Sequence, residues 1–101
     1  EVKNTYGTGC FMLVNVGNKP VKSNSGLLST VCYALNGEVW YALEGAVEVA
    51  GAGIEWAKET MNLFTDFEDF DQKVKSVPDD GDVVFVSAFS GLFSPYWRND
   101  V

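Results

Sequence analysis

The sequence contains no histidine. Histidine is the usual general base of enzymes, the activating partner of nucleophilic serine and cysteine, and a common zinc ligand. Its absence therefore excludes hydrolases that depend on a histidine base and most kinds of zinc site.

Basic residues are also scarce. The sequence has seven lysines and arginines but fourteen aspartates and glutamates, which gives a net charge of −7. Contacts with phosphates in nucleic acid or on an anionic membrane need cations, so both partners are disfavoured. No apolar run approaches the ~20 residues that cross a bilayer, and no signal peptide opens the sequence. We expect a cytoplasmic protein, with a glycosomal or other organellar address left open.

Cysteine is limited to Cys10 and Cys32, and both lie in apolar, strand-like runs. That placement favours reduced, buried thiols over a disulfide framework. Hydrophobic residues make up 47% of the 101 residues, which predicts a folded core within one domain at most. Because the sequence begins with Glu1 and not Met, we expect a piece of a longer protein.

The first half of the sequence predicts an antiparallel meander. Residues 2–16 form two short strand-like runs joined at Gly7-Thr8-Gly9, where glycine permits positive φ. Two further runs, 27–35 and 38–43, flank Asn36-Gly37, which is the strongest short-range signal for a hairpin turn.

The second half predicts two helices and a buried strand. Apolar residues recur at helical spacing over 46–61, and Thr65-x-x-Glu68 forms a capping box for a second helix that Pro78 ends. The run 83–86 is apolar at every position, as in a buried central strand. The order β-β-β-β-α-α-β predicts an α/β or α+β fold with helices packed on a sheet.

Seven of the fourteen acidic residues lie between Asp66 and Asp82. A calcium loop needs alternating ligands, a central glycine and a closing glutamate at its twelfth position, and this spacing is missing. A solvated helix face beside an aspartate-rich turn explains the cluster, so we assign no metal site to it.

Gly51 and Gly53 stand inside the first predicted helix, where each costs about 1 kcal/mol relative to alanine. Either the helix packs closely on the sheet, or a ligand approaches its backbone. The residues alone favour packing.

The segment Thr5–Phe11, TYGTGCF, has two interpretations. Gly-x-Gly is common at hairpin tips and is weak evidence for a phosphate site by itself. However, its glycines leave amides unobstructed, and the Thr8 hydroxyl adds a neutral donor that can follow a moving phosphoryl group. A rigid hairpin also supplies the positioning on which phosphoryl transfer depends.

Four blocks of this sequence are distinctive: TYGTGCF with the following MLVN, Gly26–Thr30, Trp40–Ala46 and Ser90–Trp97. In their order and spacing these blocks resemble the glycerol kinase family, within the FGGY carbohydrate kinases. Related sugar kinases share the glycine hairpin, whereas YALEG and SGLFSPYW are more particular to glycerol kinases. The resemblance runs from Asn4 to about Trp97.

This resemblance implies an actin-like, ribonuclease-H-like kinase of two domains, with ATP and Mg²⁺ held in the cleft between them. Residues 1–101 would form the beginning of the second, C-terminal domain: an antiparallel sheet, then helices and a buried strand. The whole enzyme would transfer the γ-phosphoryl group of MgATP to glycerol and release sn-glycerol 3-phosphate.

The resemblance also implies roles for particular residues. Thr8, with Gly7 and Gly9, would face the γ-phosphate, and Phe11 would form an apolar wall beside glycerol. Gly51 would let the nucleotide phosphates pass close to the helix start. The catalytic aspartate of the family lies upstream of the hairpin, so we expect no catalytic residue here and no activity from this chain alone.

Two positions depart from the family. Some members carry glutamine at Glu55 and reach the nucleotide with it, whereas a carboxylate repels phosphates, so Glu55 either turns outward or is not a ligand. Asn99 stands where the family usually has proline. The alternative function is a non-enzymatic, stand-alone interaction or oligomerisation domain derived from an FGGY sugar kinase. We expect homo-oligomers in either case, since the run 83–86 and both helices would expose apolar surface.

Overall fold

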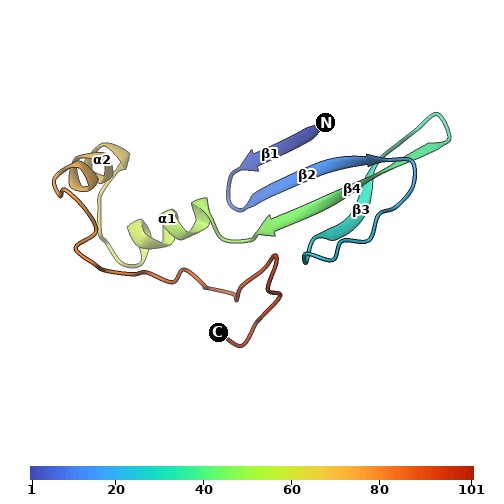
Figure 1. The fold of residues 1–101 in the computed structure, drawn as a ribbon. Helices are drawn as coiled ribbons and strands as arrows, with labels where there is room; N and C mark the ends of the chain where they lie inside the picture. The colour runs from blue at the N-terminus through green and yellow to red at the C-terminus, as the bar shows by residue number, and fades with distance from the viewer.

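The computed structural model describes all residues, Glu1–Val101. A four-stranded antiparallel sheet is followed by two helices and a long tail that returns beneath the end of the sheet (Figure 1). The elements are β1 (Val2–Tyr6), β2 (Cys10–Gly17), β3 (Leu28–Leu35), β4 (Glu38–Val47), α1 (Gly51–Glu59) and α2 (Phe67–Lys75).

The strand order in the sheet is β1-β2-β4-β3. The predicted antiparallel sheet and both predicted hairpins are confirmed, but the simple meander is wrong, because β4 pairs with β2 and leaves β3 at the edge. The loop between Gly17 and Leu28 is long enough for the chain to pass over one strand position.

The register assigns side chains to the two faces of the sheet, because residues directly opposite each other share a face. Thr5 is opposite Phe11, which is opposite Ala46, and Leu13 is opposite Glu44. One face carries mainly apolar and small residues, and the other mixes apolar with charged ones. The first includes Asn4, Tyr6, Cys10, Met12, Gly45 and Val47, and the second includes Lys3, Thr5, Phe11, Leu13, Glu44 and Ala46.

Helix α1 is shorter than the predicted helix over 46–61, because Ala46 and Val47 still belong to β4. The capping box expected at Thr65 and Glu68 is displaced by one residue. Asp66 is the N-cap of α2 and accepts a hydrogen bond from the Asp69 amide, while the Asp69 carboxylate accepts one from the Thr65 amide. Aspartate caps a helix as well as threonine does, so Asp66 takes the cap position and the Asp69 carboxylate bonds to Thr65, one residue before the cap.

The expectation of a buried strand over 83–86 is wrong for this chain. Val83, Val84, Phe85 and Val86 lie outside any strand and are 69–86% exposed, because no other strand offers them a ladder. Cys10 and Cys32 are free thiols, half-buried and not fully buried.

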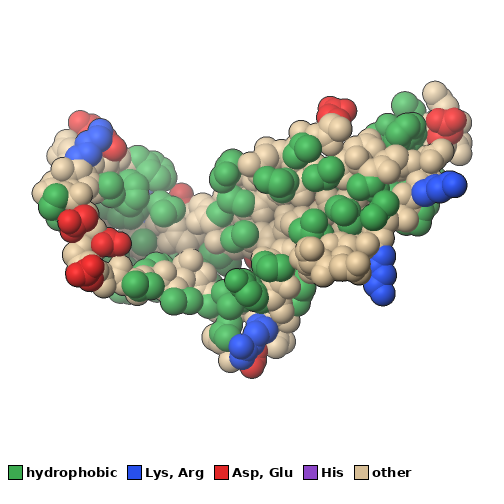
Figure 2. Space-filling model, viewed as in Figure 1, with side chains coloured by type: hydrophobic (Ala, Val, Ile, Leu, Met, Phe, Trp, Pro, Cys, Tyr) green, Lys and Arg blue, Asp and Glu red, His purple; other side chains and the backbone are tan.

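The chain does not enclose a hydrophobic core of its own. Only four of its 101 residues are buried, and its radius of gyration is 17.9 Å, against roughly 13 Å for a compact domain of this length. Hydrophobic side chains lie over the sheet and on the side of the α1–α2 region that faces the sheet (Figure 2). Neither helix has the length and hydropathy needed to span a lipid bilayer.

The cap of α2 should depend on pH. The Lys73 ammonium, which donates to the Asp69 carboxylate at 2.6 Å, and then the Thr65 amide hold the pKa of Asp69 below its ordinary value of 3.8. A depressed pKa stabilises the folded cap above the unfolded pKa, and this stabilisation is lost as pH falls through the folded pKa. We expect the Asp69 carboxyl carbon to titrate below 3.8 by NMR, with α2 fraying over the same range. Titration at the ordinary value, or identical fraying in Asp69→Asn, would contradict this account.

Candidate functional site

The tip of the β1–β2 hairpin is fixed to the first turn of α1. The Gly51 amide donates to the Gly7 carbonyl at 2.9 Å. The amides of Ala50 and Ala52 both donate to the Thr8 carbonyl, at 2.8 and 3.2 Å. The helix has no side-chain cap at Ala50, so the hairpin carbonyls satisfy amides that a helix start leaves free. These helix amides are therefore already occupied.

The donors that remain free belong to the hairpin itself. The Gly7 amide donates to the Gly9 carbonyl at 2.9 Å, which closes the turn. The amide and the hydroxyl of Thr8 have no hydrogen-bond partner within the chain, and Thr8 is exposed. An exposed amide and hydroxyl on a turn held by its neighbours form a neutral donor pair suited to an anion.

The glycines at this site are needed for different reasons. A Cβ on Gly9 would lie 2.6 Å from the Glu48 carbonyl oxygen, and one on Gly51 would lie 2.7 Å from the Gly7 carbonyl oxygen. Packing therefore explains both glycines. A Cβ on Gly53 would lie 3.1 Å from the Phe89 ring, so this glycine packs closely as expected, but against the C-terminal tail and not against the sheet. A Cβ on Gly7 would meet only the Gly9 oxygen at 3.8 Å, which leaves open space above the tip.

The tip and the outer side of α1 border a cavity of about 710 Å³, within the usual size range of ligand pockets. The structure therefore brings Gly7, Thr8 and Gly51 together, while Gly9 is buried behind the tip. Glu55 also borders this cavity. The lining consists of Gly7, Thr8, Gly51, Ala52, Ile54, Glu55, Trp56, Glu59 and Phe67.

The ionisable residues of this lining are both acidic, Glu55 and Glu59. The Thr8 donors can form hydrogen bonds with an anion, but the lining of this cavity supplies no cation to balance its charge. The tip can therefore position a phosphate, and the charge of the phosphate must be balanced by groups outside the lining.

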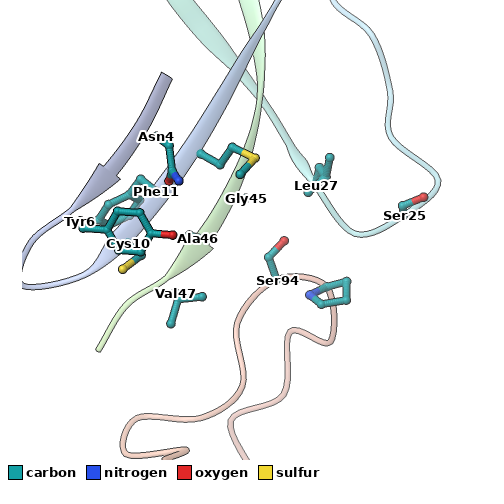
Figure 3. Close-up of a pocket in the computed structure, with 12 residues that line it drawn as sticks. Asn4, Tyr6, Cys10, Phe11, Ser25, Leu27, Gly45, Ala46, Val47 and Ser94 are labelled. Atoms are coloured by element: carbon teal, nitrogen blue, oxygen red, sulfur yellow. The ribbon is translucent and has the colours of Figure 1, made fainter. Parts of the chain in front are cut away.

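Phe11 lies away from that cavity. It is 36% exposed and borders a second cavity of about 570 Å³, between the sheet and the loop that carries Ser94 and Pro95 (Figure 3). The Gly26 carbonyl closes this region by accepting hydrogen bonds from Ser94 Oγ at 3.0 Å and Trp97 Nε1 at 2.6 Å. Two of the four sequence blocks thus contact each other directly.

Sequence reasoning missed the capping of α1 by the hairpin. The available signal was the lack of a serine, threonine, aspartate or asparagine before Gly51, because such a helix start needs another acceptor. It also did not anticipate the place of Glu55 in the cavity wall, since that depends on how α1 docks.

Comparison with known proteins identifies the family. Residues 2–101 match the C-terminal domain of the FGGY family of carbohydrate kinases. The chain belongs to this family of carbohydrate kinases.

The most informative relatives are glycerol kinases. The chain is 54% identical to the glycerol kinase of Beijerinckia indica subsp. indica over 101 residues, and 51% identical to the probable glycerol kinase of Dictyostelium discoideum over 102 residues; each alignment covers 99% of this chain. The structure of Plasmodium falciparum glycerol kinase with ADP matches 99% of the chain with a TM-score of 0.76 and 42% identity. The chain spans about a fifth of the length of these relatives.

The contact between α1 and the hairpin can be tested by adding one methyl group. Gly51→Ala places a Cβ 2.7 Å from the Gly7 carbonyl oxygen, so the hairpin must move, at a cost of about 1–3 kcal/mol. We expect a lower melting temperature for the full-length variant. Gly7→Ala is the matched control, because its Cβ meets nothing closer than 3.8 Å and should leave stability nearly unchanged. Equal melting temperatures for the two variants would refute the close contact.

Proposed function

We propose that this chain forms the beginning of the second domain of a glycerol kinase, an enzyme that transfers the γ-phosphoryl group of MgATP to glycerol. The observation that carries the proposal is the free amide and hydroxyl of Thr8 at a tip fixed to α1, beside a cavity of about 710 Å³. The glycerol kinase relatives, one of them solved with ADP, support it. The alternative of a stand-alone interaction domain gains no support from these relatives.

The reaction is a phosphoryl transfer with in-line attack. A terminal hydroxyl oxygen of glycerol bonds to the γ-phosphorus, the bond between that phosphorus and the β–γ bridging oxygen breaks, and ADP leaves. The hydroxyl proton passes to a base, which the resemblance places on an aspartate upstream of this chain. Enzymes accelerate this reaction by positioning the groups and stabilising charge, and neutral donors on a fixed hairpin suit that task.

We assign the chain's own residues as follows. Thr8 donates to the γ-phosphoryl oxygens, with Gly7 leaving space for them and Gly9 and Gly51 holding the tip in place. Phe11 forms an apolar wall for the carbon atoms of glycerol. ATP would arrive with Mg²⁺, which supplies positive charge to the phosphates, and no residue of this chain is assigned to the metal.

Three other expectations stay predictions. Residues 1–101 are proposed to be part of the second domain, so the first domain and the remainder of the second would supply the other phosphate contacts. The exposed run 83–86 and the helix faces favour a homo-oligomer. A cytoplasmic protein with no nucleic-acid or membrane partner fits the net charge of −7.

Replacing Thr8 by valine in the full-length enzyme tests the proposal. Valine keeps the β-branched shape but removes the hydroxyl donor, so folding should hardly change. Losing a donor to the transition state should lower kcat about 10²–10³-fold, with little change in the KM for glycerol. Thr8→Ser keeps the hydroxyl and should retain most of the activity, whereas Phe11→Ala should impair glycerol use more than ATP use. Near-normal kcat in a folded Thr8→Val enzyme would contradict the proposal, because the hairpin would then be an ordinary turn with no role in phosphate binding.

A further inference from the structure

Strand β3 forms an edge of the sheet whose outer side has no partner. β1 and β3 are the two edge strands (Figure 1), and β3 bonds to β4 on its inner side. The backbone hydrogen bonds outside the ladders and helices involve no residue of β3, so its outward N–H and C=O groups are unpaired within the chain. Such an edge is a template for a further strand.

The composition of β3 does not protect this edge. Edge strands of natural proteins are usually short or carry charged residues or proline. β1 follows that rule, because it has five residues and includes Lys3. β3 has eight residues, LSTVCYAL, without charge, proline or glycine, and such a strand associates unless something covers it. Its large apolar side chains are 44–65% exposed, and they are Leu28, Val31, Tyr33 and Leu35.

An irregularity in β3 restricts how a further strand can pair with it. The register against β4 shifts between Val31 and Tyr33, which leaves Cys32 in a bulge. Nearer the start of the strand, the Ser29 hydroxyl donates to the Val21 carbonyl, so the β2–β3 loop flanks the edge there. The free part of the edge therefore begins after Ser29 and contains the bulge.

The charges at the two ends of β3 are complementary. Lys22 follows Val21 in the loop beside the start of β3, and Glu38 lies opposite Leu35 at its end. Both charged residues are exposed, and neither has an ion pair within the chain. When two β3 strands run antiparallel, the start of each lies beside the end of the other, so Lys22 of each copy meets Glu38 of its partner. Opposite charges thus meet at both ends of a neutral strand, although each chain carries −7.

We propose that β3 pairs antiparallel with β3 of a second copy of the protein, around a two-fold axis beside Cys32. An axis at the bulge places the two bulges opposite each other and keeps the segments on both sides of them in register. Val31 of each copy is then opposite Tyr33 of the other copy. The same edge serves both copies, so the contact is isologous and joins two sheets into one. It gives the predicted homo-oligomer a specific interface and does not depend on the chemistry at Thr8.

Charge reversals in the full-length protein test this interface. Lys22→Glu and Glu38→Lys should each raise the Kd of the dimer about tenfold or more in sedimentation analysis, because each replaces two attractive contacts by two repulsive ones. The variant with both changes restores the pair with exchanged charges, so its Kd should return to within about threefold of the wild-type value. Lys3→Glu is the matched control, since it makes the same change of charge at the β1 edge and should alter Kd by less than about twofold.

Cross-linking tests the position of the axis. In the proposed dimer the two Cys32 residues are directly opposite each other, and such pairs have Cα atoms about 4.5–5.5 Å apart. A short bis-maleimide should therefore join the two thiols. We expect a covalent dimer from the wild type and from Cys10→Ser, because Cys10 lies on β2 and away from this edge, and no covalent dimer from Cys32→Ser.

Each outcome decides the inference. A monomeric wild type at micromolar concentration, a Kd that neither reversal changes, or a double variant that dimerises no better than the single ones overturns it. The edge would then be covered by another part of the protein or by a different partner. Cross-linking that persists in Cys32→Ser also overturns it, and where a reversal variant does not fold, the cross-link decides. Glycerol phosphorylation by the wild type is measured separately, so failure of this interface leaves the proposed function standing.

Discussion

The contact between the glycine hairpin and the first turn of α1 determines the geometry of the whole site. The carbonyls of Gly7 and Thr8 cap the helix, and a Cβ at Gly51 would prevent their approach. Because those carbonyls turn toward the helix, the Thr8 amide and hydroxyl are left without partners beside the cavity. The helix and the hairpin thus hold each other in place. Rigidly positioned hydrogen-bond donors of this kind are what phosphoryl transfer requires.

The charge of the chain limits what this site can do by itself. Its hairpin offers neutral donors, while Glu55 and Glu59 border the same cavity in a chain of net charge −7. Such a surface orients a phosphate but does not balance its charge. The low burial of the chain points in the same direction, since four buried residues do not make a core.

Local signals in the sequence predicted much of the fold, but they did not predict how the elements are arranged relative to one another. The glycines around Thr8 and the Asn36-Gly37 turn located both hairpins, since each needs a particular backbone conformation. The order of strands did not follow, because it depends on which strand the β2–β3 loop passes over. At the site, the motif indicated Thr8, whereas the capping of α1 by the hairpin carbonyls depends on how the helix docks and required the structure.

The most direct test is an amide NMR titration of the full-length protein with MgADP and then with a non-hydrolysable MgATP analogue. The account predicts that the Thr8 amide proton moves downfield, chiefly with the analogue, because it gains a hydrogen bond to the γ-phosphate. The amides of Gly51 and Ala52, which already donate to the hairpin, should move much less. An unchanged Thr8 amide, or larger shifts at Gly51 and Ala52, would contradict the claim that the hairpin tip holds the phosphate.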